Sequence, residues 1–218
     1  MTVSSALRLR DHAYSNFTEK LLARDIRPGQ IVSQRELVEL TGMPLGAIRE
    51  MIPRLEADGL IKTVPKRGLQ VLSIDIDLVR NAFQLRGIIE GEAIAEFCKS
   101  ATKDEIKRLA KQHRDIREEA VASVSPEVLR RAQQIDWDFH DLIVDAMGNP
   151  IISDIHRVNA IKIRLIRNSE TRMLPELVVS VIDEHLAIFS ALEVSDSEGA
   201  VQAIHSHINS AKKRALGM

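Results

Sequence analysis

Residues 134 to 149, QIDWDFHDLIVDAMGN, place a carboxylate and an imidazole where an amphipathic helix should be apolar. On a helix with about 100° per residue, Phe139 and Ile143 share the apolar face. Asp136 and His140 fall on the same side. A carboxylate that faces a hydrophobic core is costly unless another group pairs with it. The D-x-x-x-H spacing therefore predicts either a buried partner or a bound ion.

Two further histidines point inward from later helical stretches. His185 projects from the apolar stripe of VVSVIDEHLAIFSAL, and His207 lies on the apolar side of GAVQAIHSHINSAKKR, whereas His205 points about 160° away. One inward histidine is usually a satisfied core residue, but three imidazoles and one carboxylate form an N₃O ligand set. Such a set suits Zn²⁺, Ni²⁺, Fe²⁺ or Mn²⁺. The candidate ligands are Asp136, His140, His185 and His207.

The remaining histidines have weaker claims to a ligand role. His12 and His113 lie in polar surroundings, and His156 lies at the edge of the apolar arc of its helix. We expect that none of these three, nor His205, binds the ion.

Six amphipathic stretches, separated by proline and turn residues, must position these groups. They span roughly residues 77 to 99, 103 to 123, 126 to 147, 150 to 170, 175 to 193 and 196 to 215. The pattern predicts an all-helical second domain, residues 76 to 218, folded as a six-helix antiparallel bundle.

Residues 1 to 75 follow a different pattern. Ser33-Gln34-Arg35-Glu36 is a capping box that begins a helix, Thr41-Gly42 marks a turn, and PLGAIREMIPRLEADGL supplies a second helix. Two β-prone runs, Ile61 to Val64 and Leu69 to Leu72, flank a Pro-Lys-Arg-Gly turn. Helix, turn, helix and basic hairpin describe a winged helix-turn-helix, whose second helix enters the major groove of DNA. The chain is thus predicted to be mostly α, with a small β-hairpin wing.

A plainer interpretation of the same residues is a small helical domain whose hairpin and charges are only solvated. Pro53 is unusual within the second helix, because it removes one backbone hydrogen bond and should kink or end the helix near Arg49.

Composition excludes several classes of protein. A net charge of −1 gives no global basic field that would indicate nucleic-acid binding. A chain of 218 residues with 44% hydrophobic content can bury a substantial core. The single cysteine, Cys98, excludes an internal disulfide. Because it follows Phe97, we expect a buried thiol on a helix, in a protein of the reducing cytoplasm. We expect neither secretion nor membrane spanning, because no signal-peptide core or long apolar run occurs. A nucleotide-binding module is disfavoured because neither G-x-G-x-x-G nor a P-loop occurs.

Residues 26 to 72 resemble the DNA-binding domain of GntR-type bacterial regulators. The resemblance rests on "PG" before the capped helix, "R-E" in the recognition helix and "L-x-x-x-G-L" before the wing. It implies DNA contacts from Arg35, Arg49, Arg67 and Gly68. Lys66, in the turn of the basic hairpin, is a further candidate contact. One departure is Leu45, where the family commonly has arginine, so the operator is expected to differ from the common family sequence.

The remainder of the chain resembles the FCD effector domain of the FadR-type branch. The resemblance rests on LRGIIEGEAIAEFC, the D-x-x-x-H helix ending in Gly-Asn, Glu184-His185 and the later A-x-x-A-I-x-x-H-I. It implies that Asp136 and the three inward histidines hold a divalent metal, with zinc as the first choice, beside a small carboxylate effector. It also implies a homodimer, and six helices look more like the VanR-type subgroup.

Arg86 projects between apolar residues of its helix, so a permanent cation points inward. It either forms a structural ion pair with Glu90, one turn on, or receives the carboxylate of an effector in bidentate geometry. Asn159 is a second candidate contact for the effector.

The function expected from these features is that of a cytoplasmic, homodimeric transcription factor. It would be a repressor that leaves a palindromic operator when a small organic acid binds. One alternative is a metal sensor, in which the ion itself is the signal. A metal-dependent hydrolase would need a general base beside the bound water, and the sequence nominates none, so an enzyme is not expected.

Overall fold

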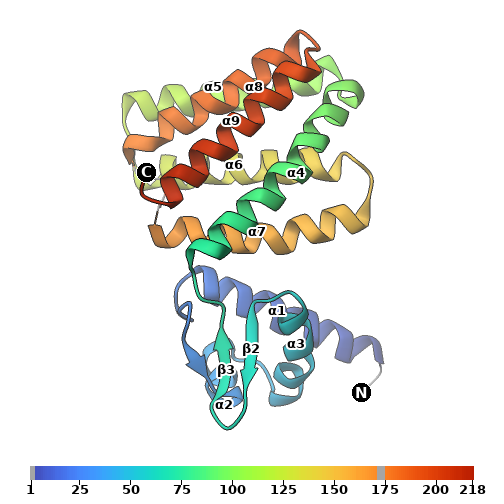
Figure 1. The fold of residues 1–218 in the computed structure, drawn as a ribbon, viewed down its shortest axis with the longest axis vertical. Coiled ribbons are helices and arrows are strands. Elements are labelled where there is room, and N and C mark those ends of the chain that lie inside the picture. The colour runs from blue at the N-terminus through green and yellow to red at the C-terminus, as the bar shows by residue number, and fades with distance from the viewer. Residues whose placement is uncertain (1–2, 171–174) are drawn as a thin grey trace. The chain divides into compact units, whose positions relative to one another are not determined.

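The computed structural model describes residues 3 to 170 and 175 to 218. The chain divides into two compact units, Met1–Ile76 and Asp77–Met218 (Figure 1). Within the described ranges, no helix carries an apolar stretch sufficient to cross a membrane.

The first unit has the predicted winged helix-turn-helix architecture (Figure 1). Its helices are α1 (Val3–Leu22), α2 (Gln34–Thr41) and α3 (Leu45–Ala57), and its strands are β1 (Ile31–Val32), β2 (Ile61–Val64) and β3 (Gly68–Val71). The strands form one antiparallel sheet in the order β1-β3-β2, with Thr63 opposite Leu69 and Ile31 opposite Gln70. The sequence pattern predicted the β2–β3 hairpin but not the short β1.

Local residue choices define the ends of α2. The Ser33 hydroxyl accepts from the Glu36 amide at 3.1 Å, and the Glu36 carboxylate accepts from the Ser33 amide at 2.6 Å, so the predicted capping box is present. At the other end, Gly42 takes a left-handed conformation with φ of 68°. This cap turns the chain sharply into α3.

Gly68 is required by the sheet itself. Its φ is 121°, and a Cβ atom added there would lie 2.7 Å from the backbone oxygen of Val32 in β1. Only glycine tolerates that approach, so β1 can pass close to the first residue of β3 and pair with the next two, Leu69 and Gln70. Gly68 itself pairs with Val64 of β2, so β3 starts one residue ahead of the predicted Leu69.

Pro53 lies within α3, which continues to Ala57, so of the two predicted effects, a kink or an end near Arg49, the second is wrong. Pro53 is exposed, whereas Ile52 and Leu55 on the same helix are buried. The backbone group that proline leaves unpaired can therefore face water, while core packing holds the helix together.

The second unit contains six α-helices among its described residues, as predicted. They are α4 (Ile76–Ser100), α5 (Lys103–Ala122), α6 (Pro126–Asp145), α7 (Pro150–Glu170), α8 (Val178–Glu193) and α9 (Ser197–Ala215). The predicted stretch from residue 175 differs at its start, because Pro175–Leu177 forms a 3₁₀ turn before α8 begins. Helix α8 packs against α5, α6 and α9, and α6 packs against α5 and α7.

The core of the second unit is aromatic and aliphatic, with polar groups at its centre. Phe83, Phe97, Phe139 and Phe189 are all at most 2% exposed. Cys98 is only half-buried, so the prediction of a buried thiol is wrong. On α4 it is Phe97 that faces the core, and its neighbour lies at the margin of that face.

Candidate metal centre, ligand cavity and DNA-binding surface

The four predicted metal ligands meet inside the second unit. Asp136 and His140 come from α6, His185 from α8 and His207 from α9, and each is at most 4% exposed. One ligand atom from each residue lies within 4.8 Å of all the others. Residues from three helices therefore form one compact cluster.

The contacts within the cluster join potential ligand atoms. Nε2 of His207 lies 3.2 Å from Nε2 of His140 and 3.3 Å from Nε2 of His185. Nε2 of His185 lies 3.4 Å from Oδ1 of Asp136. That carboxylate oxygen is buried and has no hydrogen-bond partner among the described residues.

Local structure explains why these side chains converge. The four-residue spacing in α6 puts Asp136 and His140 on one face, and Ser125 caps the start of that helix. Helix α9 begins after Asp196, whose carboxylate accepts from the Gly199 amide at 2.9 Å. The short connection between α8 and α9 holds these two helices side by side.

The outer nitrogen of each histidine has a partner of its own. Nδ1 of His140 lies 2.7 Å from Oε2 of Glu90, and Nδ1 of His207 lies 2.8 Å from Oε2 of Glu184. Because an ionised carboxylate only accepts, Nδ1 of His207 carries the proton and its Nε2 presents a lone pair to the centre. The His140 contact lacks hydrogen-bond geometry, but a proton on its Nδ1 avoids placing two acceptors 2.7 Å apart and leaves its Nε2 in the same state. This arrangement is typical of histidines that bind a metal through Nε2.

Electrostatics keep the cluster in the protonation state that a cation needs. Burial, assisted by Arg86, lowers the pKa of His140 to about 4, and burial likewise lowers the pKa values of His185 and His207. For Asp136, burial acts to raise the pKa, but Arg167 and the imidazoles hold it below its usual range. Neutral imidazoles and an ionised carboxylate are therefore present at neutral pH, and the donor set fits a divalent ion.

Two histidines that the sequence pattern placed outside the cluster lie next to it. His113 of α5 is 1% exposed, so the prediction of polar surroundings is wrong, and its Nε2 lies 3.1 Å from Nδ1 of His185. His156 of α7 is 4% exposed, with its Nε2 3.2 Å from Glu90. A signal for His113 existed, because it follows the buried Leu109 by one helical turn.

A cavity of about 20 Å³ lies beside the cluster. Its lining includes Arg86, Glu90, Trp137, His140, His156, Asn159, Arg164 and Arg167. Arg86 donates from Nε to Glu90 at 2.8 Å, so the structural ion pair considered above is present. Its Nη1 atom, however, is buried and has no hydrogen-bond partner among the described residues. The guanidinium can thus hold Glu90 and still donate to a ligand.

Trp137 is a cavity residue that the sequence pattern did not single out. Its Nε1 is a buried donor with no partner in the described part of the chain, and the Arg164 guanidinium lies 4.5 Å from its ring centroid. Asn159, the second candidate contact for the effector, is buried, and its amide donates to the backbone oxygen of Ala82 at 2.9 Å. Trp137 is therefore a better candidate than Asn159 for contact with a ligand.

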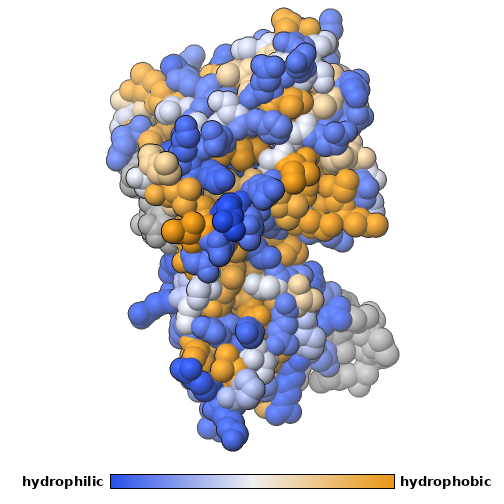
Figure 2. All heavy atoms as spheres, in the orientation of Figure 1, coloured by the Kyte–Doolittle hydropathy of each residue, from blue (hydrophilic) through white to orange (hydrophobic). Residues whose placement is uncertain are grey.

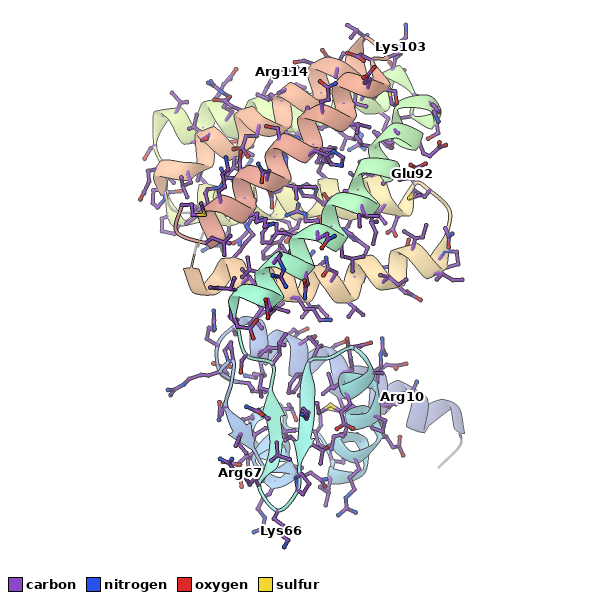
Figure 3. The ribbon with its side chains drawn as sticks, in the orientation of Figure 1. Arg10, Lys66, Arg67, Glu92, Lys103 and Arg114 are labelled. Carbon is purple, nitrogen blue, oxygen red and sulfur yellow. The ribbon has the colours of Figure 1, made fainter. Side chains whose placement is uncertain are left out.

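The residues expected to contact DNA lie on the surface of the first unit. Arg35, Arg49, Lys66 and Arg67 are exposed. Lys66 and Arg67 lie at the tip of the β2–β3 hairpin (Figure 3), where the space-filling view shows a hydrophilic surface (Figure 2). Leu45 is the first residue of α3 and is 42% exposed.

Gln34 joins this surface without having been predicted. Its side chain accepts from Nε of Arg49 at 3.2 Å, which links the start of α2 to α3. It also lines a groove with Arg35, Thr63 and Lys66. Gln34 can therefore orient the arginine expected to read DNA.

A winged helix-turn-helix and a helical bundle with a polar centre define a DNA-binding regulator with a ligand-binding domain. The FCD domain family matches residues 81–210, and the family described as bacterial regulatory proteins, gntR family, matches residues 9–71. The chain belongs to the GntR family of bacterial regulators, in the branch that carries an FCD domain.

Individual relatives agree with this assignment. The chain is 24% identical over 197 residues to the transcriptional regulator LgoR of Escherichia coli, a match covering 88% of this chain and 63% of LgoR, less than two thirds of that relative. It is 25% identical over 195 residues to the transcriptional repressor RspR of the same organism, covering 87% of this chain and 83% of RspR. These relatives are regulators and not enzymes.

A solved structure supports the fold. A GntR transcriptional regulator from Rhodococcus sp. RHA1 matches with a TM-score of 0.72 and 17% sequence identity, over 99% of both chains.

Proposed function

We propose that this protein is a repressor that binds a palindromic operator as a homodimer and is released by a small carboxylate effector. The effector would bind in the cavity beside a divalent ion held by Asp136, His140, His185 and His207. Such a regulator would act in the cytoplasm, where bacterial DNA lies.

One observation carries the proposal: four buried acceptor atoms converge beside a cavity that contains an unpaired guanidinium nitrogen. The acceptors fit a cation, and Arg86 Nη1 fits an anion. The two sites would be coupled, because His140 belongs to the candidate ligand set and also lines the cavity.

Charge balance favours an anionic effector. Asp136 is paired with Arg167 at 2.6 Å, Glu90 with Arg86 at 2.8 Å, and Glu184 with Arg214 at 2.8 Å. A divalent ion bound by the cluster would act as a Lewis acid; zinc is the first choice, and nickel, manganese or iron are alternatives. It would add two positive charges, which these three ion pairs do not compensate. A carboxylate in the cavity offsets that charge.

The alternative of a metal sensor also has an observation in its favour. The cavity is about 20 Å³, which holds roughly one water molecule. An organic acid must therefore displace side chains to enter, whereas an ion alone needs no such change.

Operator binding measured under four conditions separates these functions. The protein is titrated into a fluorescent DNA duplex from its own promoter region under four conditions. These are metal-free protein alone, protein with Zn²⁺, protein with one acid from a panel of acetate, glycolate, succinate and citrate, and protein with both Zn²⁺ and an acid. We expect release only with Zn²⁺ and an acid together. Release by Zn²⁺ alone supports the sensor, and no response to any combination contradicts both. By linkage, operator DNA should weaken acid binding by the same factor, typically 5- to 150-fold, or about 1 to 3 kcal/mol.

Matched variants test the ligand assignment in the same preparation. His185→Ala and His207→Ala should reduce the zinc content of the purified protein and abolish release. His205→Ala, two residues from His207 and outside the cluster, should retain about one ion per chain, the number that four ligands in one cluster predict. Equal zinc content in all three variants would contradict the ligand assignment.

A further inference from the structure

His113 touches the candidate metal centre without contributing a ligand atom to it. It lies on α5, which like α4 and α7 supplies none of the four candidate ligands, and it is 1% exposed. Its Nδ1 lies 2.8 Å from the backbone oxygen of Leu109, and its Nε2 lies 3.1 Å from Nδ1 of His185. The ring therefore bridges a backbone carbonyl and a candidate ligand.

The carbonyl determines which nitrogen of His113 carries the proton. A carbonyl oxygen only accepts, so Nδ1 of His113 must donate to Leu109. In a neutral imidazole the other nitrogen is then an acceptor. The ring is 1% exposed, and a charged imidazole would be costly to bury there, so the neutral form is favoured. Its Nε2 can thus only receive a hydrogen bond.

The same constraint passes to His185. Because Nε2 of His113 accepts, Nδ1 of His185 must be the donor across the 3.1 Å contact. Its own Nε2 is left with a free lone pair, and this is the atom that lies 3.4 Å from Asp136 and 3.3 Å from His207. The backbone oxygen of Leu109 thus fixes the tautomer of His113, and His113 in turn fixes the tautomer of His185 that binds a metal through Nε2.

The other two candidate ligands are held differently. His140 and His207 face carboxylates of Glu90 and Glu184, each of which is balanced by an arginine. His113 accepts the corresponding hydrogen bond from Nδ1 of His185, but as a neutral group. No further buried charge therefore has to be balanced beside Asp136.

We infer that His113 is a positioning residue, which fixes the tautomer of His185 and links the metal centre to α5. The inference rests on the metal site of the proposed function. Outer hydrogen bonds of this kind orient a ligating histidine and raise its basicity, and their loss typically weakens metal binding about 10- to 100-fold.

Zinc affinity in three variants of the full chain tests this role. His113→Leu keeps a side chain that packs against Phe139 and Phe189 but removes the acceptor. Competition with a chromogenic chelator should show zinc binding roughly 10- to 100-fold weaker than in the wild type. His113→Gln, whose amide oxygen can accept from His185, should recover most of that loss. His205→Leu, a histidine outside the cluster, should bind zinc as the wild type does.

The tautomer itself can be measured without any variant. Long-range ¹H–¹⁵N spectra of the metal-free wild type should show His185 protonated on Nδ1 and bare on Nε2. A proton on Nε2 would overturn the inference, as would a folded His113→Leu variant with wild-type zinc affinity. A wild type that binds no zinc would instead overturn the metal centre of the proposed function, and with it the role of His113. The two failures are therefore distinguishable.

Discussion

The metal-free protein should be sensitive to mild acid, because burial lowers the pKa values of four histidines, His113, His140, His185 and His207. Burial lowers the pKa of His140 to about 4, whereas an unfolded histidine has a pKa near 6.5. Between these values the unfolded chain binds more protons, so the free energy of unfolding should fall as pH falls from about 6.5 towards 4. Each such histidine contributes at most about 1.4 kcal/mol per pH unit.

Urea unfolding in the presence of a chelator, at pH values across that interval, measures this slope. His140→Gln should reduce it, and His12→Gln, at an exposed histidine, should leave it unchanged. The carboxylates add little in this interval, because the pKa of Glu184 is lowered to about 2 by its contacts with His207 and Arg214, which outweigh burial. A stability independent of pH would contradict the buried neutral histidines.

A substitution at Trp137 should change the affinity for the carboxylate effector without lowering the stability of the protein. Its Nε1 is a buried donor without a partner among the described residues, so Trp137→Phe removes an unsatisfied group and keeps most of the ring. We expect the melting temperature of the free protein to be unchanged or higher, while affinity for the effective carboxylate falls by about 0.5 to 1.5 kcal/mol. Differential scanning fluorimetry and calorimetric titration measure the two quantities. A large loss of stability with unaltered carboxylate affinity would show that Trp137 is only a packing residue.

At the scale of elements, the wing depends on a glycine for structural reasons. Gly68→Ala would force a Cβ atom to within 2.7 Å of the Val32 backbone at a φ of 121°, so the β1–β3 contact must open. We expect a loss of about 1 to 3 kcal/mol in the free energy of unfolding. Arg67→Ala, at an exposed neighbour, should leave stability unchanged and weaken DNA binding evenly across sequences. Urea unfolding of both variants decides, and equal stability would contradict the requirement for glycine.

Much of this architecture follows from sequence pattern, because apolar periodicity and caps are local signals. The capping box at Ser33, the hairpin and the six helices of the second unit could be predicted in this way. The strand Ile31–Val32 could not, because two residues carry no periodicity and their pairing with β3 is a tertiary contact.

The burial of the four candidate ligands could also be predicted, because each lies on the apolar face of its own helix. The contacts around them were not, because His113 meets His185 across 72 residues and Arg86 Nη1 is unpaired only in the folded environment. Sequence spacing thus finds groups that point inward, and folding decides which of them meet.

At the scale of the whole molecule, the net charge of −1 gives little long-range attraction to DNA, so we expect a single chain to bind DNA weakly. A homodimer would present two such units to two half-sites. Exposed apolar residues on the second unit, including Ile88 at 65% and Ile151 at 71%, offer surface for self-association. We therefore expect two chains per inverted-repeat operator. Light scattering of the free protein and of its DNA complex measures this, and a monomer in both would contradict the proposal.

The residues that read the operator should differ in what they recognise. Arg49 lies on α3 and is oriented by Gln34, so Arg49→Ala should cost about 1 to 3 kcal/mol in operator affinity and relax the preference at one base pair of each half-site. Gln34→Ala should produce a smaller loss at the same base pair, because it acts through Arg49. In the proposed homodimer, each substitution would act at both half-sites. Binding to a library of single-base operator variants, repeated at several salt concentrations, distinguishes lost base recognition from lost phosphate contact. An Arg49→Ala protein with unchanged base preference would place the reading residues elsewhere on α3, where the exposed Leu45 already departs from the family pattern.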